Sequence, residues 1–469
     1  MLIRNATLVG LGDGSVQRNV TCRIEGSKIA SVEPDQRQAP SGQAPPRQAY
    51  SQAPGAGETI DPQAPGASGK TGKPDAGETI DAGGAYLIPG LVNLHAHTAM
   101  APLRGTAEDV SPESWFNEHI WIYEQNLTPS DVYWGTLLGA LEMLSGGVTG
   151  VADHYFFMDQ AFEAFRDSGM RANLAQAVFG FGEQKDALLE QAVGFAREYR
   201  NADERISVSL GPHSPYLCPD DFLKKVVDHA SALDVPVHIH VSETAKQLEQ
   251  SLAEHGRTPV EALRDTGVLS GNAILAHAYH GTDSDLALIA ESGAMVAHCP
   301  KTYMRFGDST DFLPRALSSG VRVGLASDGA ASNSTMNLFE VARDAALLAK
   351  TASGDPERAR VNEVLPLLTA GGRMLGLPDY GEVRVGAPAD LVLVRPDTPA
   401  MNPGFSPAAD LLYSVSRANV DTVMVNGRVV VRNGHHVDIN EQEVFERNRE
   451  LVERVATRNS DTPMQTFKG

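Results

Sequence analysis

Two histidines stand one residue apart at the end of an apolar run, in the stretch PGLVNLHAHT that covers residues 89–98. On a β-strand, residues two apart project from the same face, so the side chains of His95 and His97 point the same way. Two neutral imidazoles at that spacing can share one divalent metal ion. An HxH pair also arises by chance, so this signal needs further ligands to carry weight.

Three later stretches end in side chains of the same chemistry. VPVHIHVSET places His240 at the end of a strand with Glu243 on the loop, NAILAHAYH carries His277, and VRVGLASDGAASN carries Asp328. A third histidine beside a carboxylate suits a catalytic metal site, which keeps one position open for water. Each stretch alone could be a strand-end cap or a packed histidine, the interpretation that we give to His238. Together the stretches favour one site.

The elements that must position these side chains are eight short strands. The strand-like runs are GLVNLHAH, VTGVADHY, RANLAQAVF, ISVSLGPH, VPVHIHVSE, NAILAHA, AMVAHCP and VRVGLASD. Amphipathic segments separate them, such as 129–147, where Thr128 is the expected N-cap and Pro129 opens the helix. Eight βα units predict an α/β fold, a (β/α)₈ TIM-type barrel, with its chemistry at the carboxyl ends of the strands. Most of the runs end in or beside His, Asp or Glu, which indicates one shared site.

The flanking sequence predicts a second, small β-sandwich domain. Short strands with turn residues fill the N-terminal segment and return after residue 380. Residues 36–75 are rich in Pro, Gly and Ala, and the AGETID of residues 56–61 recurs at 76–81, which predicts a partly duplicated, flexible insertion. We therefore divide the chain into a small β domain (1–85 and 380–440, with the 36–75 insertion), a metallohydrolase barrel (86–379) and a C-terminal helix and tail (441–469).

Composition excludes some partners. The chain of 469 residues has 59 acidic and 39 basic side chains, a net charge of −20, which argues against nucleic acid or an anionic membrane as a partner. Its three cysteines, Cys22, Cys218 and Cys299, are too far apart for a disulfide framework and suit a reducing compartment. The first residues, MLIRNATLVG, indicate a strand rather than a signal peptide or spanning helix. We expect a cytoplasmic protein.

The motifs PGLVNLHAH, HVSE, LAHA and SDGAASN resemble those of the amidohydrolase superfamily, in its mononuclear aminohydrolase (deaminase) branch. VGAPADLVLV and VNGRVVVRNG are similar to the return strands of that family. PLRGTAEDVSPESWF, GPHSPYLCP and SDGAASNSTMNLF most resemble methylthioadenosine/S-adenosylhomocysteine deaminases. The likeness covers nearly the whole chain outside residues 36–75.

The resemblance implies one divalent metal ion per chain, zinc or else iron. Its implied ligands are His95, His97, His240 and Asp328. Binuclear relatives carry a bridging carboxylated lysine on the fourth strand, but ISVSLGPH contains no lysine. One metal ion is therefore expected.

The same resemblance implies roles for the remaining residues. Asp328 would accept a proton from the attacking water, Glu243 would protonate the ring nitrogen and then the departing ammonia, and His277 would orient the attacking oxygen. The residues implied in substrate binding are Trp115, Glu124, Gln176, His213 and Tyr303. Among these, Glu124 would bind ribose hydroxyls and Trp115 would wall the pocket, although a solvated helix residue and a core residue are equally good interpretations.

Two departures from the family pattern put the substrate in doubt. Relatives that bind a homocysteine tail carry an arginine where this chain has Gln176, and an amide cannot supply that charge. Arg171 lies nearby but aligns with a more structural position. The loop usually written HNPxSNxKL is HCPKTYMRFGDS here, with Thr302 and Tyr303 replacing Ser and Asn. The ring could thus be purine-, pterin- or triazine-like.

Three functions remain open on the sequence. The first is a metal-dependent hydrolytic deaminase of a nucleobase-like heteroaromatic amine, which takes water and releases ammonia. The second is a chlorohydrolase or cyclic-amide hydrolase on the same scaffold. The third is a catalytically silent binding protein, which the complete ligand set speaks against. A homodimer or larger homo-oligomer stays open.

Overall fold

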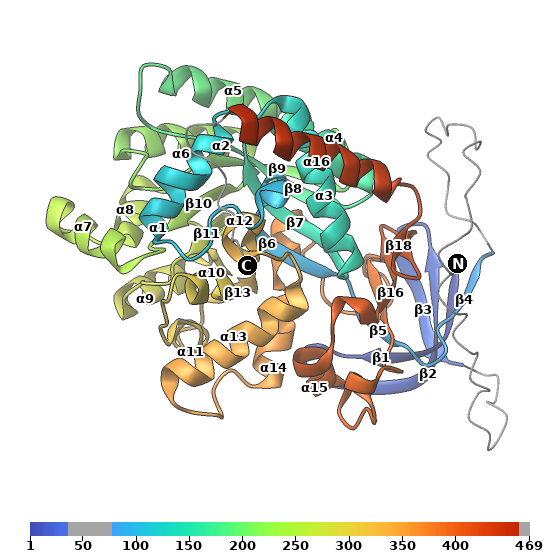
Figure 1. Ribbon diagram of the computed structural model, residues 1–469. Helices are drawn as coiled ribbons and strands as arrows, with labels where there is room; N and C mark the ends of the chain where they lie inside the picture. The colour runs from blue at the N-terminus through green and yellow to red at the C-terminus, as the bar shows by residue number, and fades with distance from the viewer. Residues whose placement is uncertain (36–76, 459–469) are drawn as a thin grey trace.

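The structure is a computed structural model that describes residues 1–35 and 77–458. These residues form two nine-stranded sheets, which we call the barrel sheet and the small sheet. Figure 1 shows the barrel on the left, surrounded by helices, and the small sheet on the right, where the blue N-terminal strands meet the red-orange C-terminal ones. The predicted insertion at 36–75 and the tail from 459 lie outside the described residues.

The barrel sheet confirms the predicted (β/α)₈ architecture. Its strands run parallel in chain order, and every predicted run contains one of them. They are β6 (Leu91–His97), β7 (Val148–Tyr155), β8 (Arg171–Val178), β9 (Ile206–Pro212), β10 (Val237–Val241), β11 (Ala273–His277), β12 (Met295–His298) and β13 (Arg322–Leu325). The last run continues as β14 (Asp328–Gly329), which pairs with β6 and closes the barrel. Strands such as β11 and β12 are buried throughout because helices cover them.

Helices follow most of the strands. The predicted helix is α3 (Pro129–Ser145), and Thr128 caps it in a reciprocal capping box with Asp131. The others of the barrel are α4 (Met158–Ser168), α5 (Lys185–Tyr199), α6 (Asp220–Leu233), α7 (Ala245–His255), α8 (Pro259–Thr266), α9 (Asp283–Ser292), α10 (Pro300–Arg305), α11 (Phe312–Ser318), α12 (Ala330–Asn333), α13 (Leu338–Ser353) and α14 (Val361–Val364).

Short, tight turns of helix replace a regular helix between β6 and α3. This segment consists of η1 (Thr98–Leu103), α1 (Pro112–Ser114), the π-helical η2 (Trp115–Ile120) and α2 (Trp121–Glu124). Further short turns follow the barrel, namely η3 (Leu365–Leu368), η4 (Ala370–Leu375), η5 (Pro399–Met401), α15 (Pro407–Ala409), η6 (Asp410–Ser414) and η7 (Arg417–Asn419). The predicted C-terminal helix is α16 (Glu441–Arg458), which contacts α3.

The small sheet joins the two ends of the chain, as the sequence predicted. Its strands are β1 (Leu2–Val9), β2 (Val16–Glu25), β3 (Lys28–Pro34), β4 (Thr79–Asp81), β5 (Tyr86–Pro89), β15 (Leu391–Val394), β16 (Val420–Val425), β17 (Arg428–Arg432) and β18 (His435–His436). β5 pairs with β1 on one side and β15 on the other. The domain division at residue 86 stays a prediction, since β5 pairs within this sheet and runs directly into the barrel.

The predicted sandwich takes the form of one sheet that folds back on itself. The backbone N–H of Ile29 donates to the carbonyl of Ala387 at 3.0 Å, which brings the start of β3 against the segment before β15. Ile3, Ile29, Leu391 and Met424 thereby share one buried apolar cluster. Among the described residues, no helix is both long and apolar enough to cross a membrane.

Candidate active site

Three histidines converge at the carboxyl end of the barrel strands. His95 and His97 lie near the end of β6, and His240 lies in β10, four strands away along the sheet. The Nε2 atoms of His97 and His240 are 3.3 Å apart, and the ring of His95 is centred 4.7 Å from that of His97. The possible ligand atoms of the three lie within 4.8 Å of one another. The HxH pair therefore acquires its third histidine from a distant part of the chain.

The second ring nitrogen of each histidine is held in place. Nδ1 of His97 lies 2.5 Å from the carbonyl of His154, and Nδ1 of His240 lies 2.8 Å from the carbonyl of His213. Because a carbonyl only accepts, each Nδ1 is the donor, and each Nε2 is left with its lone pair toward the centre. His95 is held by His238, whose Nε2 lies 2.8 Å from its Nδ1. His238 is thus the packed interior histidine that the sequence suggested.

These imidazoles fit a metal ion. Nε2 of His95 is buried and makes no hydrogen bond to any residue that the structure describes. Burial lowers the pKa of His95 to about 3 and the pKa of His240 well below its ordinary value, so both rings are neutral. Neutral imidazole is the form that binds a metal. A divalent cation would satisfy the orphaned nitrogen of His95.

Asp328 completes the cluster from the closing strand. Its Oδ1 lies 3.4 Å from Nε2 of His97 and 3.6 Å from Nε2 of His95. Its Oδ2 accepts hydrogen bonds from the hydroxyls of Thr302, at 3.0 Å, and Ser332, at 2.9 Å. Burial opposes ionisation, but the nearby imidazoles of His95, His277 and His97 hold the pKa of Asp328 below its usual range. The group is therefore a carboxylate anchored on one oxygen.

Glu243 and His277 face each other beside the cluster. His277 ends β11 with a left-handed φ of 76°, and its Nε2 lies 3.9 Å from Oε1 of Glu243. Burial raises the pKa of Glu243; the nearby Asp328 acts in the same direction, and His277 opposes it. A carboxyl group with a raised pKa keeps its proton to higher pH, and in its protonated form it can donate that proton. The pair thus offers a proton carrier next to a polar imidazole.

A small, aromatic-walled pocket of about 100 Å³ opens onto these groups. Trp115, Glu124 and His213 all line it, at the place where the sequence expected substrate contacts. Trp115 is fixed by a hydrogen bond of 3.2 Å from its Nε1 to the carbonyl of Ala331. His213 stacks between Phe179 and His240, with ring centroids 5.1 and 4.7 Å away. Flat aromatic walls suit a planar heteroaromatic ring.

Glu124 carries a buried carboxylate oxygen without a hydrogen bond in the described residues. Its Oε1 makes no hydrogen bond to any described residue, and neither does the hydroxyl of Tyr155 beside it. Burial raises the pKa of Glu124 to about 7, while Tyr155 and His97 act to lower it. Unpaired buried acceptors are costly and mark a place where a ligand completes the hydrogen bonding.

Two of the expected substrate contacts lie outside this small pocket. Gln176 lines a larger neighbouring cavity of about 720 Å³, where its Oε1 accepts a hydrogen bond of 3.0 Å from the N–H of Met158. Tyr303 does not line the small pocket at all. It is buried behind His277, with its hydroxyl 3.4 Å from Nδ1, and its ring stacks on Tyr279 at 3.6 Å. The expectation for Tyr303 is corrected because α10 turns its ring into the core.

Sequence reasoning missed three supporting residues. His154 lines the pocket and holds His97 through its carbonyl, while Thr302 and Ser332 anchor Asp328. VTGVADHY carried a usable signal for His154, because this run has a histidine beside its carboxyl end, as the runs of His95, His97 and His240 do. Thr302 and Ser332 follow strands by several residues on short helices, and no spacing rule points to them.

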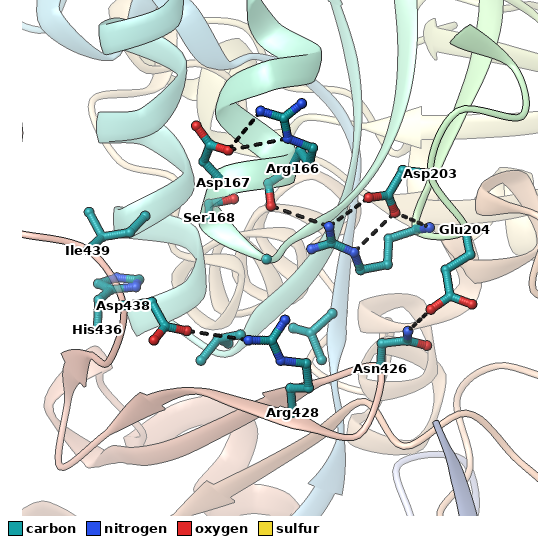
Figure 2. Close-up of a pocket in the computed structure, with 14 residues that line it drawn as sticks. Arg166, Asp167, Ser168, Asp203, Glu204, Asn426, Arg428, His436, Asp438 and Ile439 are labelled. Atoms are coloured by element: carbon teal, nitrogen blue, oxygen red, sulfur yellow. Dashed lines mark hydrogen bonds and ion pairs between the residues drawn. The ribbon is translucent and has the colours of Figure 1, made fainter. Parts of the chain in front are cut away.

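A hollow of about 300 Å³ lies at the opposite end of the barrel (Figure 2). It is lined by residues just before β8 and β9 and by the β16–β17 turn. Figure 2 shows each of its arginines facing an acid, with Arg166 on Asp167, Arg205 on Asp203 and Arg428 on Asp438. Paired cations leave no charge for an anion. Barrel enzymes work at the other end of the strands, and we assign no chemistry here.

The comparisons with known proteins agree with this geometry. Residues 86–430 match the model of the Amidohydrolase family. A 5-methylthioadenosine/S-adenosylhomocysteine deaminase from Desulforudis audaxviator is 43% identical over 367 residues, which are 78% of this chain and 85% of that protein. A 5'-deoxyadenosine deaminase from Methanothermobacter thermautotrophicus is 37% identical over 367 residues, 77% of this chain and 86% of its own.

A solved structure is similar over nearly its whole length. The crystal structure of an adenosine deaminase from Xanthomonas campestris with bound zinc has a TM-score of 0.85 and 28% sequence identity, and the match covers 97% of this chain and 98% of that one. The family match spans well over half of the sequence. The chain belongs to the amidohydrolase family.

Proposed function

We propose that this protein is a zinc-dependent hydrolytic deaminase of adenosine-type nucleosides, which replaces the ring amine with oxygen and releases ammonia. The observation that carries the proposal is the convergence of His95, His97, His240 and Asp328 on one point next to Glu243 and His277. The names of the relatives support the substrate class, since both deaminases with the higher identity act on 5'-modified adenosines by name.

His95, His97, His240 and Asp328 would hold the ion. Histidine nitrogens with a carboxylate oxygen are a donor set that zinc accepts. Bound there, zinc supplies Lewis acidity that brings the pKa of a water molecule toward neutrality. The zinc of the Xanthomonas campestris enzyme supports the choice of metal.

The side chains of this chain then handle the protons. Asp328, a carboxylate with Oδ2 held by Thr302 and Ser332, accepts a proton from the attacking water through Oδ1. Glu243 donates a proton to the ring nitrogen beside the carbon under attack, and afterwards assists the proton transfer to the leaving amine. His277 orients the incoming oxygen and stabilises the charge that develops on it.

The shape and the polar groups of the pocket favour a nucleoside substrate over a free base. Trp115, His213 and the other aromatic walls accommodate a flat ring, and Glu124 offers a buried carboxylate oxygen to a sugar hydroxyl. A charge-assisted hydrogen bond of that kind is among the stronger polar contacts. The second cavity beyond Glu124 leaves room for a substituent on the sugar.

The test is an ammonia-release assay on the zinc-loaded full chain. The panel contains methylthioadenosine, 5'-deoxyadenosine, adenosine, guanine, a pterin and an aminochlorotriazine, and chloride release is followed in parallel. We expect ammonia from the adenosine derivatives and about one zinc ion per chain by elemental analysis. The Asp328→Asn variant should lower turnover by several orders of magnitude while the protein stays folded. Chloride alone, or ammonia only from the pterin, would contradict the proposal.

A further inference from the structure

We propose that the larger cavity beside the catalytic pocket binds the 5' substituent of the nucleoside, and that it selects uncharged apolar substituents over those that carry a carboxylate. This inference rests on the proposed function and concerns the same site. It predicts that a methylthio or alkylthio group is accepted and that the amino-acid tail of S-adenosylhomocysteine is disfavoured.

The position of the cavity follows from the walls that it shares with the pocket. Trp121, Glu124 and Phe179 line both spaces. A nucleoside with its ring at Glu243 and a sugar hydroxyl at Glu124 would lie along this shared wall. Its 5' substituent would then extend into the larger space, between α2, α4 and α5 in the upper part of Figure 1. The small pocket has a volume of about 100 Å³ and the larger cavity about 720 Å³. The larger cavity can therefore hold a substituent that would not fit in the small pocket.

The side walls of this cavity are apolar. Phe195 and Tyr199 stack on each other on α5 with ring centroids 4.9 Å apart. Phe157 and Leu188 face the same space and are each 39% exposed, which is unusual for large apolar side chains. An apolar substituent would cover this surface and remove it from water, which is favourable. The walls therefore suit a thioether or alkyl group.

The charges around the cavity disfavour an anion. Among its lining residues that the structure describes, the charged ones are the carboxylates Glu124, Asp159 and Glu198, and none is a lysine or arginine. The polar neutral ones are glutamines and tyrosines, and Gln176, whose Oε1 accepts the N–H of Met158, offers an anion only the uncharged N–H donors of its amide. A substrate carboxylate would lose water without gaining a cation and would meet like charge. The electrostatics thus act against the homocysteine tail.

The experiment compares kcat/KM for adenosines that differ only at the 5' position. The zinc-loaded full chain is given methylthioadenosine, a longer uncharged alkylthio derivative, the same derivative ending in a carboxylate, and S-adenosylhomocysteine. We expect both uncharged substrates to exceed the carboxylate by about tenfold or more, a usual range for discrimination by one substrate group. Equal kcat/KM values for the matched pair would overturn the inference.

Two sets of variants test the electrostatic cause. The double variant Asp159→Asn/Glu198→Gln should raise the ratio of kcat/KM for the carboxylate substrate to that for its uncharged match, and added salt should shrink this gain. The control Glu33→Gln/Glu443→Gln removes the same charge from exposed positions on β3 and α16 and should leave the ratio unchanged. An equal rise in the control would show a general charge effect and overturn the inference.

A gained cation gives the complementary result. Gln176→Arg should raise the ratio of kcat/KM for the carboxylate substrate to kcat/KM for its uncharged match above that of the parent protein, because a guanidinium can pair with the carboxylate. Gln176→Met also removes the hydrogen bond to Met158 but adds no charge, so it should not raise the ratio.

The outcomes also separate the two proposals. Ammonia from no adenosine derivative contradicts the proposed function itself, whereas ammonia released equally well from charged and uncharged substrates contradicts only the assignment of this cavity.

Discussion

The hydroxyl of Tyr303 sits where it can fix the hydrogen-bonding state of His277. It accepts a hydrogen bond of 3.2 Å from the N–H of Cys299, which directs its own O–H toward Nδ1 of His277 at 3.4 Å. An Nδ1 that accepts leaves the proton of the neutral ring on Nε2, on the side that faces Glu243. Tyr303 is thus a positioning residue, which acts on the substrate only through His277.

Removing that hydroxyl should slow turnover without weakening substrate binding. We expect Tyr303→Phe to lower kcat by about 10- to 100-fold, the usual effect of losing a partner behind a working histidine, and to leave KM nearly unchanged. Tyr279→Phe is the matched control, because the hydroxyl of this stacked tyrosine accepts a hydrogen bond from the N–H of Thr310 and does not contact His277. Steady-state measurements of kcat and KM for both variants test this prediction. A normal kcat in Tyr303→Phe, or the same loss in both, would contradict the assignment.

At the scale of elements, the barrel strands were predictable because each is a short apolar run that ends in a polar residue. GLVNLHAH and VTGVADHY contain β6 and β7, and His97, Asp153 and His154 all lie at or near the carboxyl ends of these strands. A barrel strand is apolar along its length because both of its faces are buried, and in this fold the functional side chains lie at the carboxyl end of the strand. The cluster of His95, His97, His240 and Asp328 could be predicted for the same reason, since its members lie at or near strand ends.

The segment between β6 and α3 could not be predicted in the same way. Residues 98–127 form short 3₁₀, α and π turns with no sustained apolar period, so periodicity gives no boundary. The orientation of Trp115 is set by a contact with Ala331, 216 residues later. The place of Tyr303 is set by contacts of this tertiary kind as well, with His277 and Tyr279, which is why the sequence put it against the substrate.

The turn into β9 offers a prediction at this scale. Asp203 accepts hydrogen bonds from the N–H of Arg205 at 2.8 Å and from its guanidinium at 2.8 and 3.1 Å, and Arg205 also donates to the carbonyl of Arg166 on α4 (Figure 2). Although burial opposes it, Arg205 lowers the pKa of Asp203 below the ordinary aspartate value of 3.8. The contact between Asp203 and Arg205 therefore stabilises the folded state fully at pH values above the unfolded-state pKa of Asp203. This stabilisation is lost as the pH falls through the lower, folded-state pKa.

We expect Asp203→Asn to lower the thermal midpoint at pH 7, for a loss of about 1–3 kcal/mol in a charge-assisted contact. The difference from the parent protein should shrink toward pH 3, because the parent then loses its own carboxylate. Thermal unfolding at both pH values measures it, and Asp186→Asn, which breaks an exposed pair with Lys225, is the control with little effect. A difference that grows toward acid pH would contradict the sign.

At the scale of the whole molecule, one buried ion pair joins the barrel to the small sheet. Arg171, the first residue of β8, contacts Asp390 just before β15 through two hydrogen bonds of 2.6 and 3.1 Å, and it donates another of 2.9 Å to Asn426. Asp390 also accepts the N–H of Asn426 at 2.7 Å. The sequence had placed Arg171 in a structural role, away from the substrate, and this contact lies at the amino end of the strands.

Neutralising one member of the pair should destabilise the molecule without altering its chemistry. Asp390→Asn keeps an acceptor for Asn426 but leaves the charge of Arg171 buried and unpaired, which costs about 3–5 kcal/mol where both partners are removed from water. Both side chains are at most 5% exposed. We expect a lower thermal midpoint and a normal kcat at 25 °C, because the site lies at the other end of the barrel.

The double variant Arg171→Met/Asp390→Asn separates the charge from the contact. It removes the unpaired cation and replaces the arginine stem with an apolar chain, so it should recover part of the stability that Asp390→Asn loses. The thermal midpoints of the two variants and of the parent protein test this prediction. If the double variant is no more stable than the single one, the loss comes from the hydrogen bonds of Arg171 to both segments. The contact between the barrel and the small sheet would then depend on the hydrogen bonds of Arg171 rather than on the pairing of its charge with Asp390.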